Sequence, residues 1–399
     1  MLENVPQHSD ILDLCHICRE LGATAEFTGP HTLLLRAESL EGHVAPYRLA
    51  RKLRGSIYLT GALLGRLGRA EVAFPGGCAI GSRPVDFHVK GLTAMGARLS
   101  VERGSLVGDV QESPGGHLEG ARLYVDRASF GTTINLMLAA VLARGTTTLD
   151  NAAREPEVVD VANFLNRMGA RVRGAGTNLI RIDGVEALQG TTHEVLPDRL
   201  EAGTYLLAGA IAGGLVRVDS VISEHLHPVL AKLREAGAEL ADETDSVTVT
   251  ARGRLRAVNA ETQVHPGFPT DLQSPFLACM TTAEGVSVIH ETIFENRFGV
   301  ASELSRLGAD IKVDGDRAIV RGVPQLTGAP VEAADIRGGI ALVLAGLAAQ
   351  GETEVGHLEV VDRGYDHLEE KLVELGAEVE RFGAEGPPEA HSSLTETQV

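Results

Sequence analysis

The sequence predicts an α/β protein built from six repeated strand-and-helix units, and three observations lead to this prediction. A Gly-Ala step that ends a helix and precedes an alternating strand recurs six times along the 399 residues. The content of 44% hydrophobic residues is enough to build large buried cores. Between the repeated steps lie Ala- and Leu-rich stretches, which must pack against strands because a helix that is apolar on every side is a buried helix.

The repeated step is regular in its position along the chain. It reads LGAT, MGAR, MGAR, AGAE, LGAD and LGAE, and its glycines are Gly22, Gly96, Gly169, Gly237, Gly308 and Gly376. Successive glycines lie 68 to 74 residues apart, which is too regular for chance and indicates an internal repeat. A glycine in this place suits the left-handed conformation that ends many helices.

Each unit is expected to contain two helices and several strands. A helix over 158–168 ends at Gly169, and alternating residues then predict strands at 170–172 and 178–182. A second, apolar helix is expected to begin near a charged group, at Asp126-Arg127, Asp198-Arg199, Asp271 or Asp335-Ile336-Arg337. This helix is expected to close at a further glycine, namely Gly145, Gly214, Gly285 or Gly351.

The six units are expected to form two domains of three units each. We predict a first domain over residues 1–194, which carries the glycine-rich loop described below, and a second over 195–383. Segment 384–399 is rich in Pro, Ser, Thr and Glu and predicts a disordered tail. The first unit has only 21 residues before its repeated glycine. Its first strand and helix, about 40 residues by comparison with its sister units, are therefore expected to be missing.

Charge and composition exclude several classes of protein. A net charge of −18 argues against general binding of nucleic acids or anionic membranes. The longest uncharged apolar stretches, 205–216 and 338–349, have 12 residues each, whereas a membrane span needs about 20. The first residues do not resemble a signal peptide. Four cysteines are too few for a disulfide framework in a chain of this length, so we expect a cytoplasmic protein with reduced thiols.

A loop over 75–86, PGGCAIGSRPVD, is the first candidate for chemistry. Three glycines and two prolines predict a loop rather than a helix or strand. The loop carries the thiol of Cys78, the guanidinium of Arg83 and the carboxylate of Asp86. A nearby cation favours the thiolate, so Cys78 could donate a proton or act as a nucleophile. Composition alone does not separate this hypothesis from a tight turn with an incidental thiol.

Asp271 and a set of arginines are the second candidates. Asp271 precedes a buried helix, so it is either an ordinary N-cap carboxylate or a general base that faces a cleft between the domains. Arginines recur at equivalent places of the units: Arg54, Arg127, Arg199 and Arg337, joined by Arg363. Helix N-termini and guanidinium groups together form sites for phosphate and carboxylate, although scattered surface ion pairs would give the same pattern. Cys15 and Cys18 lie three residues apart in a predicted helix, and we expect them to pack in the core rather than bind a metal.

Six motifs, in this order along the chain, resemble one enzyme family. They are PGGCAIGSRPVD (75–86), DNAAREPEVVD (150–160), LPDRLEAGTYL (196–206), FPTDLQ (268–273), ETIFENRF (291–298) and DRGYDHLEEKL (362–372). They resemble the UDP-N-acetylglucosamine 1-carboxyvinyltransferases, which catalyse the first committed step of peptidoglycan synthesis, and the resemblance extends from residue 1 to about Phe382. It implies an inside-out α/β barrel, with two domains of three βαβαββ units, buried helices and sheets outside.

The resemblance also implies a reaction and its residues. The 3-hydroxyl of UDP-N-acetylglucosamine adds to C2 of phosphoenolpyruvate, and phosphate is then eliminated, with no metal or cofactor. Cys78 would protonate the methylene carbon, Asp271 would deprotonate the hydroxyl, and Arg83, Arg337 and Arg363 would hold phosphate and carboxylate. The implied contacts to the nucleotide sugar are Arg54, Arg83, Pro84, Val85, Asp86, Phe87, Arg127, Ala128, Ser129, Phe130, Asp271 and Ile293.

The chain departs from the family pattern at two places. Phe87, Arg127 and Phe130 stand where Leu, Lys and Val are expected. The family's S-G-A-K-N-A segment, whose Lys and Asn bind phosphoenolpyruvate, is not found in this sequence, so we expect the chain as it stands to be poorly active.

Two alternatives to this function stay open, one of them outside catalysis. One is a 3-phosphoshikimate enolpyruvyl transferase, against which the cysteine of the PGGC loop argues. The other is a catalytically impaired paralogue or UDP-sugar-binding protein. The expected partners are the small molecules phosphoenolpyruvate and UDP-N-acetylglucosamine, with no nucleic acid and no membrane. The oligomeric state is open, with a monomer as the first expectation.

Overall fold

The computed structural model describes residues 1–74 and 85–383 of the chain. Residues Met1–Asp366 form one compact unit, and His367–Val399 are assigned to a second. The predicted tail and most of the predicted loop over 75–86 fall outside the described residues. The predicted division at residues 194 and 195 stays a prediction.

A helix ends at each of the six repeated glycines, as the sequence predicts. These helices are α1 (Ser9–Glu20), α4 (Asp86–Ala94), α6 (Pro156–Arg167), α8 (His227–Glu235), α10 (Ala301–Arg306) and α12 (Leu368–Glu374). Helix α12 belongs to the second compact unit, His367–Val399. The φ angles of the six glycines all lie between 88° and 98°. This is the left-handed region, which a side chain disfavours, so the predicted helix ends are confirmed.

The first five steps each lead into an antiparallel pair of strands. The pairs are β2 (Thr24–Gly29) with β3 (Thr32–Arg36), β5 (Arg98–Glu102) with β6 (Ser105–Asp109), β9 (Arg171–Arg173) with β10 (Leu179–Asp183), β13 (Glu239–Asp242) with β14 (Ser246–Thr250), and β17 (Asp310–Asp314) with β18 (Arg317–Arg321). The strands predicted at 170–172 and 178–182 are thus confirmed, each displaced by one residue.

The second strand of every pair is also bonded to an earlier strand, so the sheets share one topology. These earlier strands are β1 (Leu2–Glu3), β4 (Arg69–Ala73), β8 (Thr146–Asp150), β12 (Leu215–Asp219) and β16 (Val286–His290). Parallel edge strands extend three of the sheets: β7 (Arg122–Tyr124) beside β8, β11 (His193–Glu194) beside β1, and β15 (Ala260–Glu261) beside β16. In one sheet Ile182 lies opposite both Thr147 and Val172, and all three side chains are buried.

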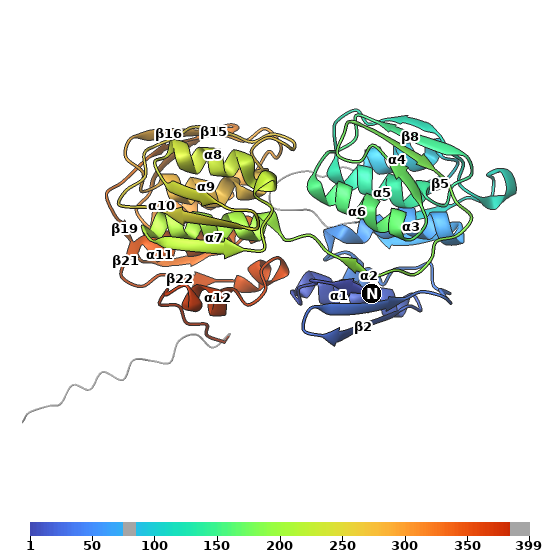
Figure 1. Cartoon of the computed structure of the whole chain (residues 1–399), viewed down its shortest axis with the longest axis horizontal. Coiled ribbons are helices and arrows are strands. Elements are labelled where there is room, and N and C mark those ends of the chain that lie inside the picture. The colour runs from blue at the N-terminus through green and yellow to red at the C-terminus, as the bar shows by residue number, and fades with distance from the viewer. Residues whose placement is uncertain (75–84, 384–399) are drawn as a thin grey trace, which may run out of the picture. The chain divides into compact units, whose positions relative to one another are not determined.

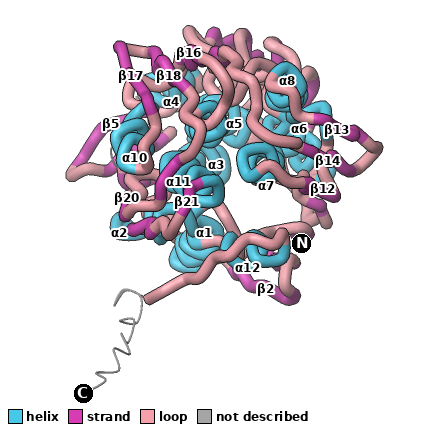
Figure 2. Tube along the Cα trace, turned by 90° about the vertical axis from the view of Figure 1, so that its left-hand side faces the viewer, coloured by secondary structure: helices cyan, strands magenta, loops and turns pink. Residues whose placement is uncertain are grey.

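The apolar helices lie inside and the sheets lie outside (Figures 1 and 2). The inner helices are α3 (Tyr58–Leu67), α5 (Phe130–Ala140), α7 (Arg199–Ala212), α9 (Gln273–Met280) and α11 (Ile336–Ala348). Helix α3 packs on α5, whereas α7, α9 and α11 pack on one another. Every residue of α9 is buried, and strands such as β10 and β18 alternate exposed with buried residues. This is the arrangement expected of an inside-out barrel.

Several helix ends differ from the sequence prediction. Helices α5, α9 and α11 end at Ala140, Met280 and Ala348, before the predicted closing glycines Gly145, Gly285 and Gly351. Helix α5 begins at Phe130 rather than at the predicted Asp126-Arg127, because the Ser129 hydroxyl accepts a hydrogen bond from the backbone N–H of Thr132 and caps the helix. Helix α7 closes at Gly213, which has a φ of 74°, instead of at Gly214. Helix α9 begins at Gln273, two residues after Asp271.

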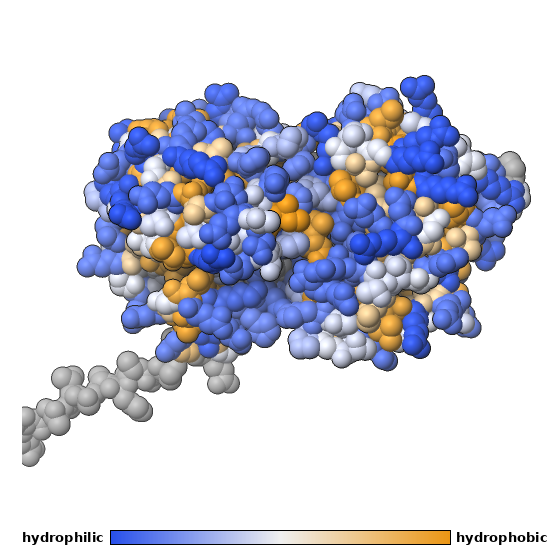
Figure 3. Space-filling model, in the orientation of Figure 1, coloured by the Kyte–Doolittle hydropathy of each residue, from blue (hydrophilic) through white to orange (hydrophobic). Residues whose placement is uncertain are grey.

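Short elements complete the described chain. They are α2 (Tyr47–Ala50), the parallel pairs β19 (Leu326–Thr327) with β21 (Ala349–Gln350) and β20 (Pro330–Glu332) with β22 (Glu354–Gly356), and six short 3₁₀ helices. These are η1 (Arg54–Ile57), η2 (Pro114–Gly116), η3 (Ser223–Leu226), η4 (Thr270–Leu272), η5 (Arg297–Val300) and η6 (Leu358–Arg363). The face in Figure 3 is mainly hydrophilic. Among the described residues, none of the helices has the length and apolar character needed to cross a membrane.

Gly61 allows α3 and α5 to approach closely, and replacing it by Ala is expected to destabilise the fold by about 1–3 kcal/mol. A Cβ at this position would lie 2.2 Å from the backbone oxygen of Asn135, so the two helices would have to separate. Urea unfolding measures the loss. Gly299→Ala is the control, because a Cβ there meets nothing within 4 Å. Equal stability of both variants would contradict this account of the helix contact.

Candidate active site

Asp271 lies in the 3₁₀ turn η4 just before α9, and Leu272 occupies the N-cap position of that helix. The Asp271 carboxylate contacts two guanidinium groups. The Oδ1 atom lies 2.6 Å from Nη2 of Arg297, and Oδ2 lies 3.7 Å from Nη2 of Arg337. The side chain stays 37% exposed, which is enough for a ligand to reach it. Leu272 rather than Asp271 thus holds the N-cap position of α9, and the Asp271 carboxylate lies beside two cations.

Arg297 is the buried member of this cluster. Its side chain is 2% exposed. It donates hydrogen bonds to the backbone oxygen of Thr270 at 3.0 Å and to Asp271, and its guanidinium lies over the Phe294 ring at 5.7 Å. A buried guanidinium is costly unless it is hydrogen-bonded and paired, and these contacts fulfil that need. Arg297 lies in the ETIFENRF motif, but the sequence analysis gave it no role. The presence of a single arginine in this motif was the one signal in the sequence that could have pointed to it.

Glu291 joins the segment that carries Ile293 to the turn that carries Asp271. It is 2% exposed. Its Oε1 accepts hydrogen bonds from the backbone N–H groups of Ile293 and Phe294 at 2.8 and 3.1 Å, and its Oε2 accepts one from the Thr270 hydroxyl at 3.0 Å. Three donors satisfy the buried carboxylate, so Glu291 fixes the position of two predicted site residues. Sequence reasoning missed this role.

Arg337 is the second residue of α11, directly after the Asp335 cap. Its side chain is 15% exposed. Burial by itself lowers the pKa of a guanidinium, but Tyr365, Asp271 and Asp198 together outweigh burial and raise the pKa of Arg337. Arg337 is therefore a permanent cation beside Asp271, as an anion-binding residue must be.

Arg363, at the end of η6, lies in a different contact set. Its Nε donates to Asp10 Oδ1 at 2.9 Å, and its Nη2 donates to the backbone oxygen of Lys52 at 3.1 Å. No contact with Asp271 is recorded for Arg363 among the described residues. Its Nη1 has no hydrogen-bond partner within residues 1–74 and 85–383. This guanidinium thus joins two distant segments and keeps donors for an anion.

The implied contacts to the nucleotide sugar lie on three elements. Val85 is buried and precedes α4, which begins with Asp86 and Phe87. Ser129 caps α5, which begins with Phe130 directly after Ala128. Arg54 is the first residue of η1. Arg83 and Pro84, together with Cys78, fall outside the described residues.

Arg127 brings two of these predicted contacts together. It donates from Nη2 to the backbone oxygens of Thr292 and Ile293, at 3.1 and 3.3 Å. These residues lie 165 and 166 positions further along the chain. Arg127 therefore links the segment before α5 to the segment that carries Ile293.

A buried polar trio holds α4 in place and was also missed by sequence reasoning. Asn135 of α5 accepts a hydrogen bond from the Gly61 N–H at 2.8 Å, and its Nδ2 lies 2.9 Å from Nδ1 of His88. Burial, with a smaller effect of Arg54, lowers the pKa of His88 to about 4. His88 is therefore neutral at pH 7. Because Asn135 donates to Nδ1, the proton of the imidazole lies on Nε2.

The cysteines of the described chain are shielded from reaction. Cys15 and Cys279 are buried and Cys18 is half-buried, and all three are free thiols. Cys15 packs with Val5, Ala25 and Leu33, which confirms the expected core role. Burial raises the pKa of Cys15 and of Cys279, and it raises the pKa of Cys18 to about 11. These thiols carry little thiolate at pH 7.

We therefore expect the epoxide fosfomycin, which alkylates the loop cysteine of the family named above, to modify Cys78 alone. The reagent reacts with thiolates, and burial keeps the other three thiols protonated. Mass spectrometry of peptides from the native protein measures the sites. Labelling of the unfolded protein, in which all four cysteines are exposed, is the control. Equal labelling of Cys78 and Cys279 in the native protein would contradict this prediction.

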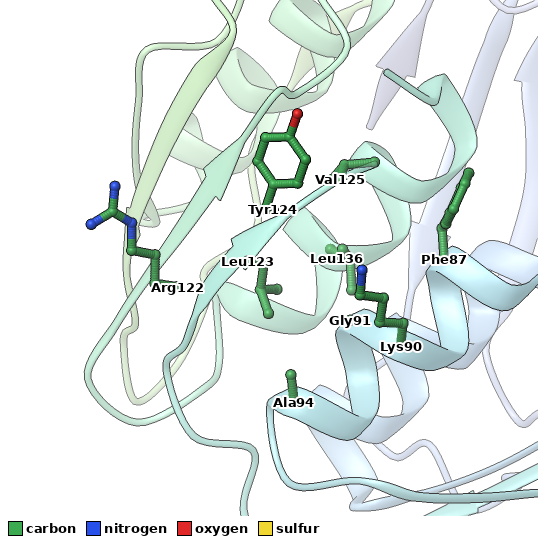
Figure 4. A pocket seen from close by; sticks show the side chains of 9 residues that line it. All are labelled: Phe87, Lys90, Gly91, Ala94, Arg122, Leu123, Tyr124, Val125 and Leu136. Carbon is green, nitrogen blue, oxygen red and sulfur yellow. The ribbon is translucent and has the colours of Figure 1, made fainter. Parts of the chain in front are cut away.

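An apolar pocket adjoins Phe87 but does not suit a nucleotide sugar (Figure 4). It lies between α4 and β7, has a volume of about 160 Å³, and includes Leu123, Val125 and Leu136 in its wall. Pockets for small-molecule ligands usually have about 300–1,000 Å³. Of the predicted contacts only Phe87 lines it. Within the described part of the chain, no three His, Cys, Asp or Glu residues gather as a metal site would require.

Comparison with known proteins identifies the family. The family model of EPSP synthase (3-phosphoshikimate 1-carboxyvinyltransferase) matches residues 1–372. A UDP-N-acetylglucosamine 1-carboxyvinyltransferase of Symbiobacterium thermophilum is 59% identical over 381 residues, which cover 96% of this chain and 89% of that protein. The resemblance drawn from the six motifs is thereby confirmed.

Solved structures agree with this assignment and with the expected fold. The crystal structure of the enolpyruvyl transferase NikO from Streptomyces tendae has a TM-score of 0.84 and 28% identity, covering 94% of this chain and 88% of that one. An EPSP synthase of Acinetobacter baumannii has a TM-score of 0.68 at 21% identity, over 91% of this chain and 87% of that one, and supports the fold alone. The chain therefore belongs to the EPSP synthase family of enolpyruvyl transferases and, within it, to the UDP-N-acetylglucosamine 1-carboxyvinyltransferases.

Proposed function

We propose that this protein transfers the enolpyruvyl group of phosphoenolpyruvate to the 3-hydroxyl of UDP-N-acetylglucosamine and releases phosphate. The observation that carries the proposal is the Asp271 carboxylate held between Arg297 and Arg337. A carboxylate of fixed position can remove a proton from a sugar hydroxyl, and the cations beside it can hold an anionic co-substrate. Family membership adds the identity of the two substrates.

In the first step, we assign Asp271 as the base that takes the proton of the 3-hydroxyl while its oxygen attacks C2 of phosphoenolpyruvate. Cys78 gives a proton to C3, which becomes a methyl group, and a tetrahedral intermediate results. In the second step C3 returns a proton to the Cys78 thiolate, the bond between C2 and the phosphate oxygen breaks, and phosphate leaves with the proton that Asp271 held. Both steps balance without an oxidant or reductant.

The arginines act on the charges of phosphoenolpyruvate in this proposal. Arg337 is a permanent cation beside Asp271, and Arg363 has donors available at Nη1. Guanidinium groups suit phosphate and carboxylate because they donate two parallel hydrogen bonds. We assign Arg337 and Arg363, together with Arg83 of the loop, to these two anionic groups.

The nucleotide sugar is assigned to the surface formed by α4, α5 and the segment of Ile293. Support comes from the Arg127 bonds, which place the segment before α5 next to Ile293. The hydrogen bonds of the neutral His88 and of Asn135 hold α4 against α3 and α5 and so stabilise the same surface. The residues that we assign to the nucleotide sugar are Arg54, Arg83, Pro84, Val85, Asp86, Phe87, Arg127, Ala128, Ser129, Phe130 and Ile293.

The wider setting follows from the proposed reaction. An enzyme that modifies UDP-N-acetylglucosamine in this way serves peptidoglycan synthesis, and we place it in the cytoplasm. The free thiols of Cys15, Cys18 and Cys279 agree with a reducing compartment. We further propose a monomer in which the chain divides into domains at residues 194 and 195.

Phosphate release from phosphoenolpyruvate in the presence of UDP-N-acetylglucosamine tests the function, together with calorimetry of the sugar alone. We expect UDP-N-acetylglucosamine to bind more tightly than UDP, and shikimate 3-phosphate not to bind. Turnover with shikimate 3-phosphate would overturn the choice of acceptor. Binding of the nucleotide sugar without phosphate release would favour the alternative of an impaired, sugar-binding paralogue.

A further inference from the structure

The phenol of Tyr365 holds one side of the Arg337 guanidinium. Tyr365 is 2% exposed, and it follows Arg363 by two residues in the DRGYDHLEEKL motif. Nη1 of Arg337 donates to the Tyr365 hydroxyl at 3.2 Å, and the guanidinium carbon lies 5.6 Å from the centre of the ring. The face of the ring attracts the guanidinium cation, and the hydroxyl oxygen accepts a hydrogen bond from it.

The direction of this hydrogen-bond chain can be worked out. The Thr204 hydroxyl, which is buried in α7, donates its single proton to the backbone oxygen of Leu200 at 2.9 Å. The Tyr365 hydroxyl lies 2.8 Å from the Thr204 oxygen and must therefore be the donor between them. Burial raises the pKa of Tyr365, so the phenol keeps its proton at pH 7. The chain runs from Arg337 through Tyr365 and Thr204 to the backbone of α7.

The geometry leaves the other side of Arg337 available. Its Nη2 lies 3.7 Å from Asp271 Oδ2, which is too far for a hydrogen bond. A long side chain fixed at Nη1 loses its freedom to rotate, yet the protons on Nη2 stay directed toward Asp271. An anionic group of a substrate beside Asp271 could accept hydrogen bonds from Nη2.

We infer that Tyr365, supported by Thr204, is the positioning residue that directs Arg337 toward phosphoenolpyruvate. This inference rests on the proposed function, and it adds two residues to which no role has been given. Tyr365 acts through Arg337 and does not touch the reacting atoms. Its loss should therefore weaken the use of phosphoenolpyruvate and leave the use of the nucleotide sugar nearly unchanged.

Tyr365→Phe tests this inference, because Phe keeps the ring and removes the hydroxyl. We expect KM for phosphoenolpyruvate to rise about tenfold, which is the effect of losing one hydrogen bond to a charged group. KM for UDP-N-acetylglucosamine should change by less than about twofold. Thr204→Val should also raise KM for phosphoenolpyruvate, but by a smaller factor. Thr204→Ser keeps the hydroxyl and should have the KM of the unaltered protein. The double variant should be no worse than Tyr365→Phe alone, because both changes break one chain.

The outcomes separate this inference from a structural role and from the proposed function. A rise in both KM values with a lowered Tm, or an unchanged KM for phosphoenolpyruvate, would overturn the inference. If the unaltered protein releases no phosphate from the two substrates, the proposed function fails by itself. Calorimetry with phosphoenolpyruvate then still tests the role of Tyr365. Weaker binding of phosphoenolpyruvate by Tyr365→Phe than by the unaltered protein supports the inference, and equal binding overturns it.

Discussion

Asp271→Asn is expected to lower kcat by about 10²–10⁴, the range for loss of a general base. Asn has the same shape and can still accept a hydrogen bond from Arg297, so the fold should remain, but it cannot take the proton of the 3-hydroxyl. KM values for both substrates should stay within a few-fold of wild type because the arginines remain in place. Steady-state kinetics of phosphate release measure both quantities, at an enzyme concentration high enough for the low activity that is expected of the unaltered chain.

Asp219→Asn is the matched control for this change. Asp219 is an exposed carboxylate of β12 that pairs with Arg217 at 2.7 Å. Its replacement by Asn removes a negative charge at a place outside the site. Its kcat should equal that of the unaltered protein. A kcat for Asp271→Asn that also remains near the unaltered value would remove Asp271 from the role of base.

Arg297→Met is expected to lower both activity and stability. It removes the donors to the Thr270 oxygen and to Asp271, which are 3.0 and 2.6 Å away. A buried hydrogen bond to a charged group contributes about 1.5–3 kcal/mol. Because Asp271 is partly exposed and water can replace the lost donor, we expect a loss of about 1–2 kcal/mol. Urea unfolding measures the stability, and kcat should fall about tenfold or more because Asp271 is no longer fixed.

Two further variants make this test sharper. Arg297→Lys keeps the charge but not the planar fork of donors, so it should recover most of the stability and little of the activity. Arg321→Met removes an exposed arginine that pairs with Asp310 at 3.5 Å, and it should change stability by less than about 0.5 kcal/mol. If Arg297→Met proved as stable and as active as Arg321→Met, Arg297 would not be needed to fix Asp271 for the reaction.

The backbone of the repeat was predictable because its signals are local. A glycine with positive φ is required at each helix end, and an alternating pattern over a few residues shows which face of a strand is buried. Gly169 and the strands on either side of Thr177 followed from neighbouring residues alone. The start of α5 was misplaced because the capping hydroxyl of Ser129 is a weaker signal than the charged pair before it.

The residues around the site depend on contacts between distant segments. Thr204 and Tyr365 are 161 positions apart, and Arg297 reaches Asp271 across 26 positions. A polar residue in an apolar stretch shows that it needs a partner when buried, but it does not show which residue that partner is.

The sequence by itself determined the repeat of six units, the helix ends at its six glycines, the hairpins and the family, because each rests on short-range backbone preferences or on contiguous motifs. The residue pattern left Asp271 between a helix cap and a base, and the family resemblance favoured the base. Neither gave a role to Arg297, Glu291 or Tyr365. Only the tertiary structure shows which groups these four side chains contact. Helix α9 begins two residues after Asp271, which takes the carboxylate off the cap position. Folding then places two guanidinium groups beside that carboxylate, where a charge removed from water needs an opposite charge nearby.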